Sequence, residues 1–260
     1  MSLDTTFNAA QKPAPGELIE AAKKKEDPET IKAVKTLLLR GAEINEKDAQ
    51  GNTALISAAR MGNTEVVRLL IAANADLNLM NNRGHTALST AVRTGSVDVM
   101  NLLIDNNADV NTKTIARQRT ALMAGIIPGW HAVITPEVVQ TLASNGAVLD
   151  EKDKVGRTAL MWAAYFNQTE IMPVLMSNGA SIDELDDEGH SALDLAQQNN
   201  SHDAIVMLEG IFDLRQRQAE EKARAEAAEK ERVRHETVAE KQQNIKKNAP
   251  KLKLKAAPSP

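Results

Sequence analysis

Apolar side chains recur along most of the chain in short blocks with helical spacing, and each block is followed by a glycine or an asparagine. Within residues 53–74, Leu55 and Ala59 fall on one face of a first helix, which Gly62 is expected to end. The apolar residues of 66–71 fall on one broad face of a second helix. Two helices this short cannot bury their own apolar faces, so the pattern predicts that neighbouring hairpins stack.

Two short motifs show that this helical hairpin is repeated. The triplet Thr-Ala-Leu or Ser-Ala-Leu begins at Thr53, Thr86, Thr120, Thr158 and Ser191. A second motif reads Gly or Asn, then Ala, any residue, an apolar residue, and Asn or Asp. It begins at Gly41, Asn74, Asn107, Gly146 and Gly179. The Thr or Ser hydroxyl can cap a helix N-terminus, while Gly and Asn readily adopt the left-handed conformation that ends a helix. Both motifs recur every 33 to 39 residues, which predicts a helical solenoid.

The segment that joins two hairpins at 48–53 has Asp first and Gly fourth, as is typical of a β-turn, and similar segments recur between later hairpins. Turn, two helices and this period together resemble the ankyrin repeat family. The resemblance covers residues 16–212 and implies an all-α solenoid of helix-turn-helix units with β-turn loops. We count six units: 16–47, 48–80, 81–113, 114–152, 153–185 and 186–212. The family's Thr-Pro-Leu-His reads Thr-Ala-Leu-x here, so the loop hydrogen bonds made by its His are expected to be missing.

The fourth unit departs from the period, because it holds five extra residues between Gly125 and Val139. Thr135 followed by proline is typical of a helix start, so the insertion is expected just before it, around residues 128–134. In the turn that opens this unit, Gln118 stands where the other turns have Gly. The fourth unit is therefore the first place to look for a specific function.

Four of the six aromatic residues lie close to this insertion, between Trp130 and Phe166. The ankyrin resemblance implies that Tyr165 and Phe166 face the concave side, where members of the family contact partners. Trp130, Tyr165 and Phe166 are therefore candidate anchors for a partner protein. The alternative is that Phe166 and Trp130 only pack against each other and hold the loop. Trp162 is expected to fill the core.

The same alignment places a row of cations on the concave side and in the turns: Arg60, Arg83, His85, Arg93, Arg117, Arg119, Lys154, Arg157 and His190. Five of them complete our candidate partner-binding set: Arg60, Arg83, Arg93, Arg119 and Arg157. Guanidinium groups recognise acidic or phosphorylated segments, although ordinary solvated surface is the alternative. The acidic residues 186–188 argue against an anion-binding groove that runs the whole length.

The chain changes character after Leu214. Residues 213–247 are rich in helix formers with opposite charges at helical spacing, which predicts a long solvent-exposed charged helix. Only alanines are apolar between Leu214 and Val233, so a free helix is favoured over a coiled coil with itself or with a partner. Residues 1–15 and 248–260 are expected to be disordered. In the second of these tails, Lys251, Lys253 and Lys255 could touch nucleic acid or an anionic membrane.

Charge and composition narrow the class of protein further. Residues 213–260 hold 13 Lys and Arg against 8 Asp and Glu, while the whole chain has a net charge of −4. The body is therefore acidic and the tail basic. There is no cysteine, no Sec-type signal pattern and no run of eighteen apolar residues. We expect a cytoplasmic protein. The alternative is a bacterial effector adaptor that is secreted by a non-Sec route.

No catalytic or cofactor motif is present. HExxH, GxGxxG, GxxxxGK[ST] and GxSxG are all missing, and the histidines form no pair at i, i+4 spacing. The sequence therefore predicts a non-enzymatic protein-protein interaction module or scaffold, without metal or cofactor, with its hot spot in the irregular fourth repeat. Binding of nucleic acid or membrane through the basic tail is the alternative function. We expect a monomer, with self-association through the C-terminal helix left open.

Overall fold

The computed structural model describes residues 12–128 and 134–248, which divide into two compact units, Met1–Met207 and Leu208–Pro260. The regular elements within the described residues are all helices, as the repeat pattern predicts. They are α1 (Glu17–Ala22), α2 (Pro28–Leu39), α3 (Ala54–Met61), α4 (Thr64–Ala72), α5 (Ala87–Thr94), α6 (Val97–Asp105), α7 (Ala121–Ile126), α8 (Pro136–Ser144), α9 (Ala159–Tyr165), α10 (Met172–Ser177), α11 (Ala192–Gln198) and α12 (His202–Asn248).

Each of the helices α3, α5, α7, α9 and α11 begins directly after the Thr or Ser of its triplet. The Thr53 hydroxyl accepts a hydrogen bond from the backbone N–H of Ile56 at 3.2 Å. The corresponding hydroxyls of the other four helices make the same bond: Thr86, Thr120, Thr158 and Ser191. A cap of this kind stabilises a helix by about 1 kcal/mol, so the repeated triplet fixes where each hairpin begins.

The second helix of each hairpin ends at the predicted Gly or Asn. All five residues have a positive φ, as predicted: Gly41, Asn74, Asn107, Gly146 and Gly179. At Asn74 φ is 63°, and the following N–H, that of Ala75, donates to the carbonyl of Leu70 at 3.0 Å. This bond satisfies a carbonyl that the helix end would otherwise leave unpaired.

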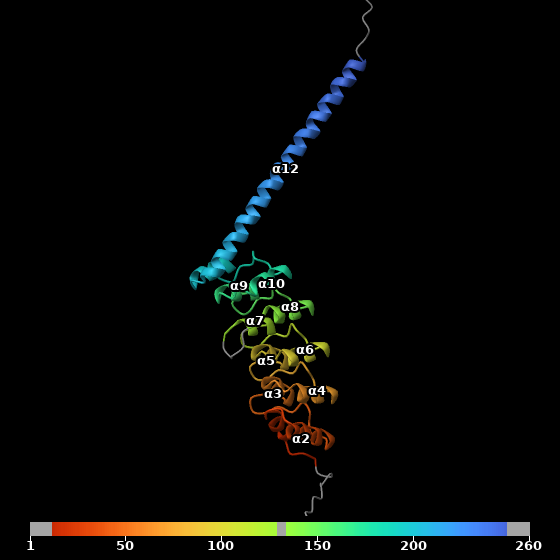
Figure 1. Ribbon diagram of the computed structural model, residues 1–260, viewed down its shortest axis with the longest axis vertical. Coiled ribbons are helices and arrows are strands. Elements are labelled where there is room, and N and C mark those ends of the chain that lie inside the picture. Colours follow the sequence, from red (N-terminus) through yellow and green to blue (C-terminus); the bar gives the residue numbers. More distant parts are fainter. Residues whose placement is uncertain (1–11, 129–133, 249–260) are drawn as a thin grey trace, which may run out of the picture. The chain divides into compact units, whose positions relative to one another are not determined.

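The hairpins of the first unit stack side by side, so that each buries the apolar face of the next (Figure 1). The first helices pack in the order α1, α3, α5, α7, α9 and α11, and second helices pack on second helices in α2, α4 and α6 and in α8 and α10. Alanines on the first helices, such as Ala58, Ala91 and Ala163, are fully buried, which lets these helices approach closely. The core is thus continuous from hairpin to hairpin.

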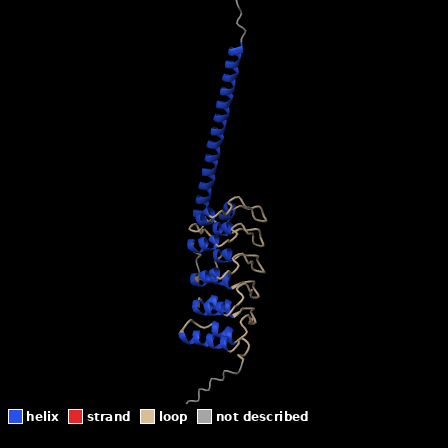
Figure 2. Cartoon of the chain, turned by 90° about the vertical axis from the view of Figure 1, so that its right-hand side faces the viewer, coloured by secondary structure: helices blue, strands red, loops and turns tan. Residues whose placement is uncertain are grey.

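The turns that join successive hairpins lie along one side of the unit (Figure 2). Backbone bonds link neighbouring turns, for example from the N–H of Asn82 to the carbonyl of Gln50 at 3.0 Å. The next pair of turns meets so closely that a Cβ on Gly84, where φ is 78°, would lie 2.2 Å from the backbone nitrogen of Ile115. Only glycine fits at such a contact, which explains why the turns carry it.

The fourth repeat keeps the hairpin despite its insertion. Thr135 caps α8, with Pro136 in the first turn, as predicted. Residues 129–133, which include Trp130 and most of the predicted insertion, lie outside the described residues. Gln118 has a φ of 54°, the left-handed conformation that the glycine of the other turns adopts. The irregular turn therefore keeps the shape of its neighbours with an unfavourable residue.

The predicted charged helix is present in the second unit, as the later turns of α12. All of its residues from Asp213 to Asn244 are exposed, in agreement with the missing apolar seam. Residues 249–260, with Lys251, Lys253 and Lys255, lie outside the described residues, as do residues 1–11. None of the helices described has the length and apolarity that crossing a lipid bilayer requires.

Candidate partner-binding surface

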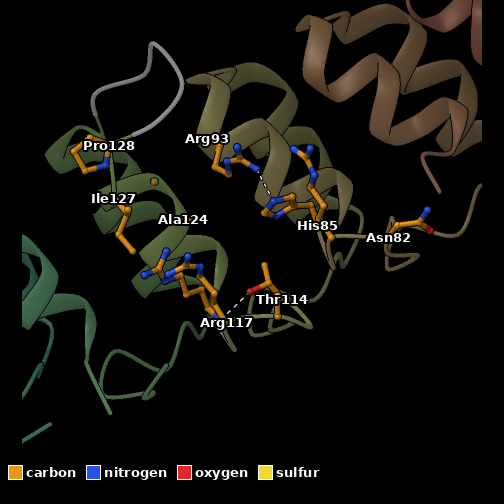
Figure 3. A pocket seen from close by; sticks show the side chains of 12 residues that line it. Asn82, His85, Arg93, Thr114, Arg117, Ala124, Ile127 and Pro128 are labelled. Carbon is orange, nitrogen blue, oxygen red and sulfur yellow. Dashed lines mark hydrogen bonds between the residues drawn. The ribbon is translucent and has the colours of Figure 1, made fainter. Parts of the chain in front are cut away.

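Two adjoining cavities open between the turns and the ends of the first helices of repeats two to four. The first cavity has a volume of about 430 Å³ and the second about 420 Å³. Both are lined by Asn82, Arg83, His85 and Arg93, so together they form one groove. Figure 3 shows the first cavity, with His85 and Arg93 on one side and Ile127 and Pro128 on another.

The lining of this groove is basic. Arg83 and Arg93 line both cavities, Arg117 and Arg119 line the first, and Arg60 lines the second. Among the described residues that line the groove there is no Asp or Glu. The acidic body therefore carries a local concentration of positive charge, as the cation row predicted, over repeats two to four.

The closest contact in the groove joins two basic side chains. A guanidinium nitrogen of Arg93 lies 2.6 Å from Nε2 of His85. Arginine can only donate, so Nε2 accepts and the proton of the neutral imidazole is on Nδ1. Burial, followed by the charges of Arg93 and Arg83, lowers the pKa of His85 to about 4. His85 is therefore neutral at pH 7, and the positive charge of the groove comes from its arginines.

The turns of the fifth and sixth repeats differ, because each opens with a buried aspartate. Asp153 accepts hydrogen bonds from two N–H groups of its own turn through Oδ1, and from Arg119 of the preceding repeat through Oδ2 at 3.3 Å. Asp186 repeats the arrangement with Arg157 at 3.2 Å. Burial raises the pKa of Asp186, but the hydrogen bonds from His190 and Arg157 outweigh it, and the pKa lies below its usual value. Each aspartate thus neutralises one arginine.

The same aspartate holds a tryptophan. Nε1 of Trp162 donates to Oδ2 of Asp153 at 3.0 Å, and the ring is only 8% exposed. The guanidinium carbons of Arg119 and Arg157 each lie 4.9 Å from the ring centre, within the range of a cation–π interaction. Trp162 is therefore a core residue, as predicted, and it also helps to position both arginines.

Tyr165 and Phe166 lie against this tryptophan. The Phe166 ring stacks on Trp162 with centroids 5.7 Å apart, and the Tyr165 ring meets both in edge-to-face contacts. Both side chains are half-buried. We name Trp162, Tyr165 and Phe166 the aromatic cluster. Because Arg119 contacts the cluster and lines the first cavity, the cluster lies beside the groove.

The structure brings together only part of the predicted binding set. Arg60, Arg83, Arg93 and Arg119 line the groove, whereas Arg157 lines neither cavity, and Trp130 lies outside the described residues. Two further features were not predicted from the sequence: the lining residues Ile127 and Pro128, and the pairing of Asp153 and Asp186 with arginines. The residue that opens each turn was a signal for these ion pairs. It is Asp in repeats five and six but not in repeats three and four, so only the later turns can offer a carboxylate.

Within the described residues no group of three His, Asp or Glu side chains could hold a metal ion. His85 and His190 lie in different turns of the row, and His131 falls outside the described residues. What the geometry offers is an open, charged surface with an aromatic edge. Such a surface suits recognition of a macromolecule.

Stacked hairpins that carry a groove along their turns define a repeat protein of the binding-module class. Its sequence pattern identifies the family: ankyrin repeats (3 copies) match residues 18–114 and 130–213. The chain belongs to the ankyrin repeat family, whose members are generally non-enzymatic binding modules. The two matched ranges are separated by residues 115–129, which belong to the fourth repeat.

Among solved structures, the chain is similar to one chain of a complex between the predatory endopeptidase Bd0816 from Bdellovibrio bacteriovorus and the immunity protein Bd3460. The two chains are 25% identical with a TM-score of 0.67, and the alignment covers 76% of this chain and 99% of that one. No curated protein matches the sequence.

Proposed function

We propose that this ankyrin protein binds a partner protein in the groove and on the adjoining aromatic cluster, without catalysing a reaction. The observation that carries this proposal is the pair of adjoining cavities, lined by turn and helix-end side chains of successive repeats. The similar solved structure holds two proteins in complex, which supports a protein as the ligand.

The fourth repeat contributes the apolar part of this surface. Ile127 and Pro128, at the end of α7, line the first cavity, in the repeat where the sequence predicted a hot spot. Tyr165 and Phe166 extend the apolar surface, and Arg60, Arg83 and Arg93 add positive charge along the groove. Apolar anchors inside a polar rim are the usual source of affinity in a protein interface.

Arg119 and Arg157 have a different role in this proposal. Each is held by an aspartate and lies over Trp162, so each shapes the surface more than it attracts a ligand. Replacing either one should therefore lower stability as well as affinity.

Affinity capture with the immobilised full-length chain tests the proposal, followed by affinity measurement with the purified partner. We expect a variant with both Tyr165→Ala and Phe166→Ala to bind at least about thirtyfold more weakly, since a single anchor of this kind is worth about 2 kcal/mol or more. Leu39→Ala is the control, because this side chain is 89% exposed on α2 and its loss removes a similar apolar group. Undiminished affinity in a folded double variant would refute the placement of the site.

A further inference from the structure

The first cavity of the groove lacks the carboxylate that neighbouring repeats supply. In the turns of repeats five and six, the opening residue is a buried aspartate that binds the arginine of the preceding repeat. The turn of repeat four opens instead with Thr114, whose hydroxyl accepts only the local bond, from the N–H of Arg119 at 3.0 Å. One of the two local bonds of the aspartate is thus kept, while its negative charge is missing.

Two arginines near this position are exposed to the cavity. Arg83 and Arg117 both line the cavity, both are exposed, and neither has an ion-pair partner among the described residues. Figure 3 labels Arg117 and Thr114, which lie in the same turn; in the next two repeats an aspartate stands at the position of Thr114. A negative charge brought to this place would face several guanidinium groups in a partly enclosed space, where ion pairs are stronger than in open water.

A second, independent observation concerns His85. Its Nε2 accepts from Arg93, so its Nδ1 carries the proton, and this atom is buried without a hydrogen-bond partner among the described residues. Buried donors are nearly always paired in folded proteins. The cavity therefore combines two arginines without an ion-pair partner, Arg83 and Arg117, with a lining histidine whose buried ring nitrogen is unsatisfied.

We propose that the first cavity binds an acidic side chain of the partner protein, whose carboxylate takes the place that Asp153 and Asp186 hold in the next repeats. An apolar residue next to it in the partner packs on Ile127 and Pro128. This proposal rests on the proposed function, since it requires that a partner occupies the groove.

Two features favour a protein segment over other anions. The cavity has an apolar side, formed by Ala124, Ile127 and Pro128, which matches the aliphatic part of a Glu side chain and its neighbours better than a free phosphate. A nucleic acid would extend along the turn row toward residues 186–188, which are acidic and would repel its backbone. A short acidic segment satisfies the cavity without reaching that end.

The experiment measures the anisotropy of a fluorescein-labelled hexapeptide of alternating Glu and Leu with the full-length protein, alongside the same peptide with Gln in place of Glu. We expect the Glu peptide alone to bind. Thr114→Asp should weaken binding at least about tenfold, because the protein then supplies its own carboxylate while keeping the turn bond. Arg117→Gln should weaken binding similarly. Because Arg117 is exposed, this variant should fold normally, and it keeps the test decisive if Thr114→Asp misfolds.

Arg68→Gln is the matched control, with the same change of charge at an exposed position on α4, away from the groove. As a second readout, NMR should show the Glu peptide raising the pKa of His85 from about 4. Wild-type affinity in Thr114→Asp or in Arg117→Gln would overturn the proposal. So would tighter binding of inorganic phosphate, or of a single-stranded oligonucleotide, than of the peptide.

The two proposals fail in different ways. If the Tyr165→Ala, Phe166→Ala variant loses the partner while Thr114→Asp keeps it, the groove is an interface and only the acidic-residue proposal is wrong. If the Glu peptide binds as expected but no partner depends on Tyr165 and Phe166, the cavity stands and the proposed interface is wrong.

Discussion

The third and fourth repeats and the fifth and sixth repeats build the same turn but treat its charge differently. In the later pair, Asp153 and Asp186 open the turns and hold Arg119 and Arg157 in place. In the earlier pair, the neutral Asn81 and Thr114 open the turns, and the arginines around them line an open groove. The opening residue of each turn thus decides whether the turn supplies a carboxylate to the preceding repeat.

Removing the tryptophan at the centre of the later repeats should have the largest effect. Trp162→Ala takes away the ring on which Phe166 stacks and leaves Asp153 without one of its donors. We expect a loss of about 3–5 kcal/mol in the free energy of unfolding, measured by urea denaturation followed by circular dichroism. Trp162→Phe should cost less, because it keeps an aromatic ring and loses mainly the hydrogen bond. Equal losses in both variants would show that the ring itself contributes little.

The difference between repeats three and four and repeats five and six can be tested at the residue that opens the turn. Asp153→Ala leaves Arg119 without its carboxylate and should lower the free energy of unfolding by about 3 kcal/mol. Thr114→Ala, at the equivalent turn position, removes one neutral hydrogen bond and should cost about 1 kcal/mol. Thermal or urea unfolding of both variants measures the difference. If the two costs were the same, the aspartate would not stabilise the later repeats as described.

His85, in the basic groove, should contribute to the pH dependence of the free energy of unfolding. The pKa of His85 is lowered from 6.5 to about 4, so the unfolded chain binds a proton here more readily than the folded one. This contribution to stability is complete above about pH 7 and is lost progressively as the pH falls toward 4. Urea unfolding at pH 7 and pH 5 should therefore show a smaller drop for His85→Gln than for the wild type. An identical drop in the two proteins would contradict the low pKa.

The smallest expected effect is a gain in stability in the irregular turn of the fourth repeat. Gln118 has a φ of 54°, whereas the other turns have glycine with φ of 77–83° at this place. Gln118→Gly should raise the free energy of unfolding by about 0.5 kcal/mol, because it relieves left-handed backbone strain. The control is Gln140→Gly inside α8, which should destabilise instead. A destabilised Gln118→Gly variant would mean that the side chain makes up for its strain.

The sequence predicted the fold in detail because each repeat carries its own local signals. The Thr caps, the Gly and Asn helix ends and the start of α8 at Pro136 all follow from side chains that act within a few residues. The site was predicted only in part. That Arg119 reaches Asp153 of the next repeat depends on how the hairpins stack, which local signals do not contain. For the same reason, Phe166 was not assigned to Trp162, on which it stacks.

The opening residue of each turn also bears on how such a surface can change during evolution. Asp153, Asn81 and Thr114 each accept a bond from the backbone N–H of the residue just before the helix cap. Replacing Asp by Asn or Thr therefore removes a negative charge from the turn and leaves the chain path intact. Mutation can in this way change the ligand preference of a single turn, one repeat at a time, while every intermediate sequence still folds.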